Sequence, residues 1–550
     1  MKNSISLLMF VLLGVLGYLP STAQQYFNKR YTAGANANVF SSALERNNRY
    51  YVIMGGIDSS NHIGGGLFKT TTGLKFIVLD NIGNIITSKL YKRDDKKETF
   101  TLPAAFTVSN NFVSLGDGTF LYAVAVIDTV LASYNPSYLN TQSAIIRFDS
   151  MGNVLMYKEY DRAYCSTSDA TNHLLADLKP DAYGNWLMLS TMLCNGNKIV
   201  FNLRKLDNAF NEIWVKNFTT SSYHNTPKHL LIEDDGYVMT GGIDNGNVKL
   251  HPDYYSSLLI KCDTAGNKLW DWQNSFDTTK LQYIINDIIR TKDGGYIYCG
   301  TGEGRPTYYS TGEWADIRTK GLIEKLDASR NSIWKTLIGT VKGSINATQQ
   351  TVIKELPNGD LMVAGTLGVL YDKTDEVKGW IRACLTRISG IDGSIIWQRL
   401  YKSPDNNDTM YLSIYDMRPT ADGGYILAGE AKNVIDRGKG PIQRGWLIKV
   451  DSNGCEWAGS PCNPTHINPL QSVLVAGFKV YPNPTSNTIH LSIAANELLV
   501  YNTYGQVVLQ ANNILAQQSI PVSHLSSGLY FVAVFDKEKN KVGVGKFYKE

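Results

Sequence analysis

The side chains best suited to metal chemistry are His224, His229, His251 and Asp253, which lie near one another in the middle of the sequence. Imidazole and carboxylate groups are common zinc ligands, and zinc-binding sequences place two of them at a short, fixed spacing. These four residues have no such spacing, so the sequence predicts no metal site. The sequence also contains no nucleophile elbow and no phosphate-binding loop.

A segment further along the chain is better suited to binding. It combines aromatic and charged residues, and two tyrosines one repeat earlier extend the set: Arg305, Tyr308, Tyr309, Glu313, Trp314, Tyr254 and Tyr255. Aromatic rings stack on sugars and peptides, while charged groups hydrogen-bond to them. We predict these seven residues as ligand contacts. The alternative, that the rings only pack a long loop against the protein, stays open.

Two turn motifs alternate along the chain and predict the elements that position these residues. One reads Asp293-Gly294-Gly295-Tyr296, the other reads Asp263-Thr264-Ala265-Gly266-Asn267, and each has seven copies at a period of about sixty residues. Asp, Asn and Gly favour tight β-turns, so each motif joins two strands. Two hairpins make a four-stranded sheet, and seven such sheets bury their faces by stacking in a ring. The sequence therefore predicts a seven-bladed β-propeller over residues 24–462.

The ends of this region predict how the ring closes. The seventh repeat lacks a clear fourth strand, whereas residues 26–31 form an orphan strand that is similar to the fourth strand at 397–401. We expect residues 26–31 to complete the last blade and so to remove an exposed edge. Cys455 and Cys462 are candidates for a disulfide bond. The Asp-rich turns are candidate calcium sites, and no other cofactor is predicted.

Repetition separates residues of the fold from residues of function. The turn Asp and Gly, the basic residue two positions before the second-motif Asp, and the fourth-strand tryptophans recur, so we assign them to the fold: Trp214, Trp270, Trp334 and Trp397. The connections between second and third strands, such as 57–73 and 301–320, are long and predict loops on one face, which is the expected ligand surface. Catalytic carboxylates would come from different blades and leave no local spacing. We expect binding without catalysis, and a polysaccharide hydrolase or lyase is the alternative.

The N-terminus and the charge bear on location. Residues 1–23 have a basic start, an apolar stretch and small residues before a cleavage site, which predicts a signal peptide for the general secretory translocon. No apolar segment reaches the ~20 residues that a membrane-spanning helix needs. A net charge of +4 over 550 residues gives no basic stripe that would indicate nucleic acid.

The C-terminal region has a different composition. Residues 463–475 read as a linker, and landmarks follow over 476–550: Tyr481, Pro482, Asn483, Pro484, Gly505, Gly528, Leu529, Tyr530 and Lys546. This region resembles the C-terminal sorting domain of the type IX secretion system. The resemblance implies a small Ig-like β-sandwich, recognition by the type IX outer-membrane translocon, and a protein that is secreted or held on the outer cell surface. The sequence thus predicts an all-β chain, a propeller followed by a sandwich, that binds a carbohydrate, a peptide or an envelope component.

Overall fold

The computed structural model describes residues 26–31, 37–64, 67–91, 98–100, 111–128, 141–160, 175–194, 198–220, 225–244, 255–274, 284–308, 314–339, 348–370, 379–404, 410–433, 443–456, 478–502, 507–537 and 541–550. Within these residues every regular element is a β-strand, and no helix could span a membrane. The chain divides into two compact units, Met1–Thr465 and His466–Glu550.

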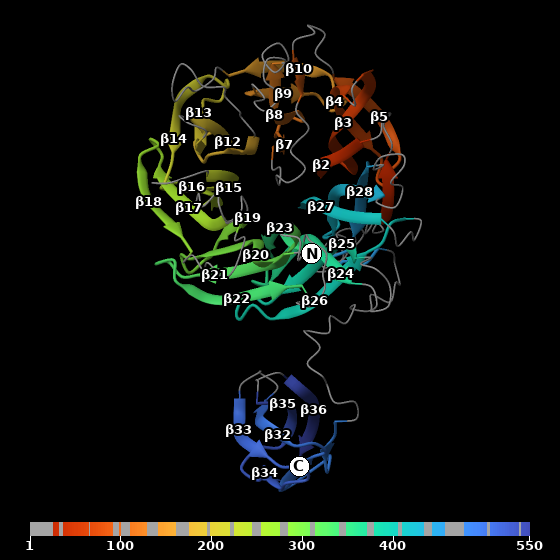
Figure 1. The fold of residues 1–550 in the computed structure, drawn as a ribbon, viewed down its shortest axis with the longest axis vertical. Helices are drawn as coiled ribbons and strands as arrows, with labels where there is room; N and C mark the ends of the chain where they lie inside the picture. Colours follow the sequence, from red (N-terminus) through yellow and green to blue (C-terminus); the bar gives the residue numbers. More distant parts are fainter. Residues whose placement is uncertain are drawn as a thin grey trace, which may run out of the picture. The chain divides into compact units, whose positions relative to one another are not determined.

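The first unit is a ring of seven antiparallel sheets, as the sequence predicts (Figure 1). Blade 1 contains β2 (Ala37–Arg46), β3 (Arg49–Gly64), β4 (Leu67–Leu79) and β5 (Ile85–Tyr91). Blade 2 contains β6 (Glu98–Phe100), β7 (Phe112–Ser114), β8 (Phe120–Asp128), β9 (Thr141–Phe148) and β10 (Val154–Glu159). Blade 3 contains β11 (Leu175–Pro180), β12 (Trp186–Cys194), β13 (Lys198–Leu206) and β14 (Glu212–Phe218). Blade 4 contains β15 (Asn225–Glu233), β16 (Gly236–Asp244), β17 (Tyr255–Asp263) and β18 (Lys268–Gln273).

The remaining three blades follow the same order from the inner strand outward. Blade 5 contains β19 (Ile284–Arg290), β20 (Tyr296–Tyr308), β21 (Trp314–Leu326) and β22 (Ser332–Ile338). Blade 6 contains β23 (Gln349–Glu355), β24 (Leu361–Leu370), β25 (Gly379–Ile388) and β26 (Ile395–Tyr401). Blade 7 contains β27 (Met410–Pro419), β28 (Tyr425–Asn433), β29 (Gln443–Val450) and, as its outer strand, β1 (Phe27–Tyr31).

The hydrophobic core lies between the blades. One cluster joins Ile53 and Phe76 of blade 1 to Phe120, Tyr122 and Phe148 of blade 2, all of them buried. Each fully buried side chain of this size contributes about 1.5–3 kcal/mol, but only when the neighbouring sheet covers it. A blade is therefore stable as part of the ring.

The N-terminal strand closes the ring in the way that the sequence predicts. β1 pairs antiparallel with β29, from Phe27 opposite Lys449 to Tyr31 opposite Gly445. The hydroxyl of Tyr31 donates to the carbonyl oxygen of Gly83 in blade 1 at 2.7 Å. In blade 6, Tyr401 occupies the same position and donates to Gly454 of blade 7 at 3.1 Å. β1 thus makes the contact that a fourth strand within the chain also makes.

The recurring tryptophans and glycines form the joint between neighbouring blades. Gly393 has a φ of 73°, which favours glycine, and a Cβ there would lie 2.4 Å from the Trp334 ring of blade 5. Gly454 of blade 7 faces Trp397 of blade 6 in the same way. The assignment of these residues to the fold is confirmed.

The recurring basic residue forms an ion pair inside its own blade. It lies on the third strand and contacts a carboxylate in the turn between the first and second strands in six blades: Arg147–Asp117, Lys205–Asp181, Lys261–Asp235, Lys325–Asp293, Arg387–Asp360 and Lys449–Asp422. Blade 1 has Val78 at this position, and its turn carries Asn47 and Asn48. Blade 1 therefore lacks both charged residues together, which is consistent with a structural role for the pair.

The prediction of long loops between second and third strands was wrong where the structure describes them. β3 continues to Gly64 and pairs with β4 from Leu67, so most of 57–73 is a hairpin. In blade 5, β20 and β21 remain paired out to Tyr308 and Trp314. Strand pairing satisfies the backbone N–H and C=O groups whatever the side chains are, which is why these polar segments stay extended.

The second unit is a small β-sandwich with its own core. One sheet contains β30 (Val480–Tyr481), β31 (Thr488–Leu491) and β34 (Ile520–Pro521). The other contains β32 (Ala495–Tyr501), β33 (Val507–Ile514), β35 (Gly528–Phe535) and β36 (Lys541–Lys549). The core joins Leu491 of the first sheet to Leu498, Val532 and Phe547 of the second, so the two sheets pack face to face.

Candidate functional site

The predicted ligand residues fall on strands more than on loops. Arg305 and Tyr308 belong to β20, and Trp314 begins β21 directly opposite Tyr308. Tyr255 begins β17 opposite Asp244. The other predicted contacts lie outside the described residues: Tyr254, Tyr309 and Glu313. The backbone brings Tyr308 and Trp314 together at the end of one hairpin, and Tyr255 lies in the preceding blade.

A second candidate site, which the sequence did not predict, lies on the inner strands around the ring axis. Six of these strands have an irregular register, and the residue that follows the irregularity is buried in each: Ser42, Asp177, His229, Asp287, Val352 and Asp416. Such a β-bulge turns a side chain away from the regular alternation. Figure 1 shows β15, β19, β23 and β27 on the inner side of the ring. The bulges thus place polar groups of several blades near one axis.

Two of these aspartates connect neighbouring blades. Asp177 accepts a hydrogen bond from the backbone N–H of Leu178 at 2.9 Å and another from the backbone N–H of Leu230, in blade 4, at 2.8 Å. Asp287 repeats the pattern with Ile288 at 2.8 Å and Ile353 of blade 6 at 3.0 Å. Each carboxylate therefore holds two inner strands together.

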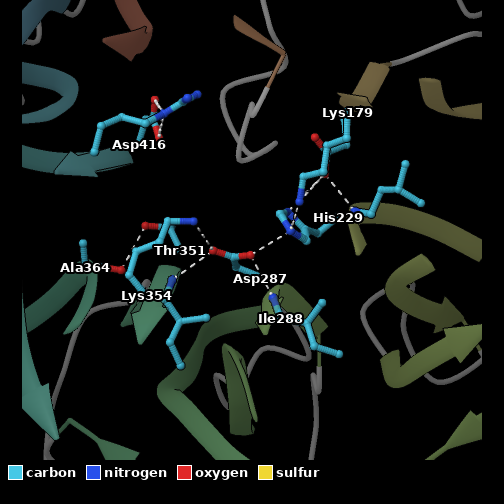
Figure 2. Close-up of polar contacts among 12 residues, drawn as sticks. Lys179, His229, Asp287, Ile288, Thr351, Lys354, Ala364 and Asp416 are labelled. Atoms are coloured by element: carbon cyan, nitrogen blue, oxygen red, sulfur yellow. Dashed lines mark hydrogen bonds and ion pairs between the residues drawn. The ribbon is translucent and has the colours of Figure 1, made fainter. Parts of the chain in front are cut away.

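His229 contacts both of these carboxylates, and Figure 2 shows it beside Lys179 and Asp287. Its Nδ1 is 3.2 Å from Asp177 Oδ2, and its Nε2 is 3.0 Å from Asp287 Oδ1. Lys179 Nζ lies 2.7 Å from the same Nε2 and 3.5 Å from Asp177 Oδ2. Lys354 Nζ approaches Asp287 from blade 6 at 3.8 Å. Four consecutive blades thus contribute to one cluster, which we call the axial cluster: Asp177, Lys179, His229, Asp287 and Lys354.

Burial and charge set the protonation of the axial cluster. Burial lowers the pKa of Lys179, although the charges of Asp177 and Asp287 oppose this effect. Burial would raise the pKa of Asp287, but the neighbouring charges of His229, Lys354 and Lys179 hold it well below its usual range. The carboxyl of Asp287 is therefore ionised at neutral pH, whereas Lys179 loses its proton more readily than an ordinary lysine.

The axial cluster does not fit a metal ion. Each imidazole nitrogen faces a carboxylate oxygen directly, so the lone pairs do not converge on a common point. Within the described residues no group of three or more His, Cys, Asp or Glu is placed to hold a metal. Of the four residues examined for zinc, only His229 lies within the described residues, and its neighbours come from other blades.

The axial cluster also fits glycoside hydrolysis poorly. One imidazole separates the two carboxylates, which agrees with the spacing of about 5–10 Å that such enzymes use. A general acid, however, needs a raised pKa, and Asp287 has a lowered one. The side chains of Asp177 and Asp287 are 0% and 1% exposed, and their oxygens accept backbone N–H groups. These carboxylates stabilise the ring.

A signal for the axial cluster does exist in the sequence. Asp177, Asp287 and Asp416 each stand inside an apolar strand, in Leu-Ala-Asp-Leu, Ile-Asn-Asp-Ile and Ile-Tyr-Asp-Met, at the same point of their repeats. A charged residue in a buried strand requires partners, so its repetition marks a polar axis. The identity of those partners depends on the ring, which no local pattern encodes.

The Asp-rich turns predicted as calcium candidates have a different use. In the turns between third and fourth strands, Asp263 Oδ1 accepts the backbone N–H of Asn267 at 2.8 Å, and Oδ2 accepts its amide at 2.9 Å. Asp207 and Asp327 repeat both contacts with Asn211 and Asn331. Calcium requires six to eight oxygen ligands, whereas these carboxylates are surrounded by N–H donors. We therefore do not propose calcium in these turns.

The remaining sequence candidates lie near the C-terminus of the propeller and in the sandwich. Cys455 is disulfide-bonded, and Cys462 lies outside the described residues.

Asn483 joins the start of the sandwich to its last strand, since its amide donates to Lys546 and its oxygen accepts the N–H of Tyr548 at 2.9 Å. Tyr530 stacks on Phe547 with ring centroids 5.4 Å apart. Of the other landmarks, Tyr481 lies on β30, Pro482 and Pro484 flank Asn483, Gly528 and Leu529 begin β35, and Gly505 lies outside the described residues.

The strand order defines the first unit as a seven-bladed β-propeller. The second unit is a sorting domain, because residues 479–548 match the family described as the secretion system C-terminal sorting domain. This match confirms the resemblance found in the sequence. The chain is therefore exported by the type IX secretion system and is secreted or reaches the cell surface.

Solved structures with similar folds are distant. Drosophila Semaphorin 2a is 8% identical with a TM-score of 0.40, and 96% of this chain and 99% of that chain are covered. A fungal alcohol oxidase of the AA5 family in complex with copper is 10% identical with a TM-score of 0.39, covering 96% and 100%. The GH93 α-L-arabinofuranosidase of Fusarium graminearum with arabinobiose is 9% identical with a TM-score of 0.35, covering 62% and 91%. No curated protein sequence matches the chain.

Proposed function

We propose that the chain is an exported binding protein whose propeller holds a carbohydrate, a peptide or another envelope component without transforming it. The observation that supports this function is the long hairpin of β20 and β21, which ends with Tyr308 paired opposite Trp314. Aromatic residues on a rigid hairpin offer stacking surface at a low entropic cost. Arg305 of β20 and Tyr255 of β17 extend the proposed surface, and the sequence adds Tyr254, Tyr309 and Glu313 to it.

Binding is tested on a glycan array with the full chain. The variant Tyr308→Ala/Trp314→Ala is expected to lose binding by about tenfold or more, because each stacked ring contributes about 1 kcal/mol. The control is Tyr183→Ala, which removes a tyrosine that is 74% exposed in the turn between β11 and β12. Equal binding by the double variant and the control would contradict the proposed surface. Release of sugar products from the same glycans would favour the hydrolase alternative.

Export is proposed to proceed in two steps. Residues 1–23 would direct the chain through the general secretory translocon to the periplasm, and the sorting domain would then engage the type IX translocon. N-terminal sequencing of the exported protein should begin near Gln24, and removal of residues 479–548 should retain the propeller inside the cell. Secretion of the shortened chain at the normal level would contradict the second step.

A further inference from the structure

The axial cluster contains an amine placed beside a base. Lys179 Nζ lies 2.7 Å from His229 Nε2, and the other ring nitrogen lies 3.2 Å from Asp177 Oδ2. An activated nucleophile has a base within hydrogen-bond distance and a third group that orients this base. The Lys179 side chain is 25% exposed, whereas His229 and both carboxylates are buried. Reagents can therefore reach it.

Two carboxylates and a second lysine surround the contact between Lys179 and His229. Only one hydrogen fits between Lys179 Nζ and His229 Nε2, so the proton is held either by the ammonium or by the imidazole. Asp177 and Asp287 contact opposite nitrogens of the ring, so a proton that passes from the amine to Nε2 comes to lie beside a carboxylate oxygen. Lys354, which faces the cluster from blade 6, disfavours a second positive charge on Lys179. Burial and Lys354 thus favour the neutral amine, and His229 lies within hydrogen-bond distance to take its proton.

We propose that Lys179 is a nucleophilic lysine that forms an imine with small aldehydes or ketones, with His229 as its base. This inference goes beyond the proposed binding function and does not rest on it. A neutral amine attacks carbonyl carbon, whereas an ammonium does not. The site would take small aldehydes, such as the open-chain form of a small sugar.

The reaction balances without a cofactor. His229 Nε2 accepts a proton from the Lys179 ammonium, and the amine lone pair forms a C–N bond to the carbonyl carbon. The C–O bond then breaks, and the carbonyl oxygen leaves as water with both remaining hydrogens of the amine. The product is a C=N double bond, and nothing is oxidised or reduced. The proton on His229 returns when water hydrolyses the imine.

Lys354 provides a matched comparison within the same protein. It holds the position of Lys179 two residues after the bulge residue of its strand, its side chain is 35% exposed, and it faces Asp287 at 3.8 Å. It differs in its contacts: Lys354 faces the carboxylate of Asp287, whereas Lys179 also lies 2.7 Å from the imidazole of His229. A difference in reactivity between the two lysines therefore reports the effect of His229 and of burial.

The experiment is reductive trapping on the full chain. Glycolaldehyde and sodium cyanoborohydride are added at pH 7, and peptide mass spectrometry follows the modification of each lysine with time. Lys179 is expected to react about tenfold faster than Lys354 or more, because a base within hydrogen-bond distance, His229, can take the proton of the amine. Because burial lowers the pKa of Lys179, its rate should level off at a lower pH than the rate of a free lysine side chain.

Variants separate the chemistry from a structural role. His229→Gln should slow trapping at Lys179 by about tenfold and leave Lys354 unchanged, and Lys179→Met should remove the fast site. Equal rates at Lys179 and Lys354 in the unaltered protein would overturn the proposal even if no variant folds. Fast labelling at Lys228 instead, a buried lysine whose pKa is lowered to about 8 by burial, would overturn the assignment to Lys179. Neither the His229→Gln nor the Lys179→Met substitution should change glycan binding by the hairpin of β20 and β21.

Discussion

Charged groups stabilise the propeller in two places, and only one of the two arrangements recurs from blade to blade. The ion pair between the third strand and the first turn recurs in six blades, while the axial cluster occurs once. Blade 1 lacks both partners of the ion pair, with Val78 and Asn48 in their places, yet its strands pair in regular order. Blade 1 thus forms without the repeated pair.

The axial cluster has no such redundancy. Asp287 accepts hydrogen bonds from two blades and contacts His229 of a third, so its loss leaves several buried groups without partners. Removing one member of a buried charge network costs far more than removing an exposed pair. The comparison teaches that repetition marks modules which tolerate loss, whereas a group made from several blades depends on every member.

The largest expected effect is that of Asp287→Ala. The free energy of unfolding should fall by about 3–5 kcal/mol, because the substitution removes the carboxylate beside His229 Nε2 and leaves two backbone N–H groups without their acceptor. The matched control is Asp293→Ala in the same blade, whose partner Lys325 lies near the surface, with an expected loss of less than about 1 kcal/mol. Urea unfolding followed by tryptophan fluorescence reports the propeller, since all ten tryptophans precede Thr465. Equal losses would contradict the comparison.

A smaller effect is expected at the closure of the ring. Tyr31→Phe removes the hydroxyl that reaches Gly83, and Tyr401→Phe removes the equivalent hydroxyl that reaches Gly454. Each should cost about 1–2 kcal/mol, because a buried carbonyl oxygen loses its donor. The same urea experiment measures both. A loss for Tyr401→Phe with none for Tyr31→Phe would mean that β1 does not serve as a fourth strand.

The ion pair itself is expected to contribute less. In a double-mutant cycle of Lys325→Met and Asp293→Asn, the coupling energy should be about 0.5–1 kcal/mol and should decrease as salt is added. Subtracting the two single effects from the double effect isolates the interaction. A coupling above about 2 kcal/mol that salt does not change would place this pair in the same class as the axial cluster.

The parts that could be predicted from the sequence are those with local causes. Asp263, Gly266 and Asn267 stabilise a turn by contacts within five residues, so their repetition predicts strands, blades and their number. The match between Phe27–Tyr31 and Trp397–Tyr401 predicted closure, because both segments perform the same contact.

The axial cluster had no comparable local cause. Asp177, His229 and Asp287 lie more than fifty residues apart in sequence, and the bulges that turn them inward are visible only in the pairing register. The long hairpins were mistaken for loops because their polar residues, such as those of 57–73, do not alternate as buried strands do. Backbone pairing extended the strands regardless.

The smallest expected effect is the loss of stability in acid. This loss should occur at a lower pH for the axial cluster than for the ion pair. Hydrogen bonding from Thr291 and Lys325 lowers the pKa of Asp293 to about 2 from an ordinary value near 3.8. A carboxyl with a lowered pKa stabilises the fold above its unfolded-state pKa, and this contribution disappears as pH falls through the folded-state value. The difference in melting temperature between the unaltered protein and Asp293→Asn should therefore be constant above pH 5, shrink from about pH 4, and vanish near pH 2. The charges around Asp287 hold its pKa lower still, so the effect of Asp287→Asn should persist where that of Asp293→Asn has gone. Parallel loss of both differences would mean that the axial cluster is no better shielded from protons than an exposed turn.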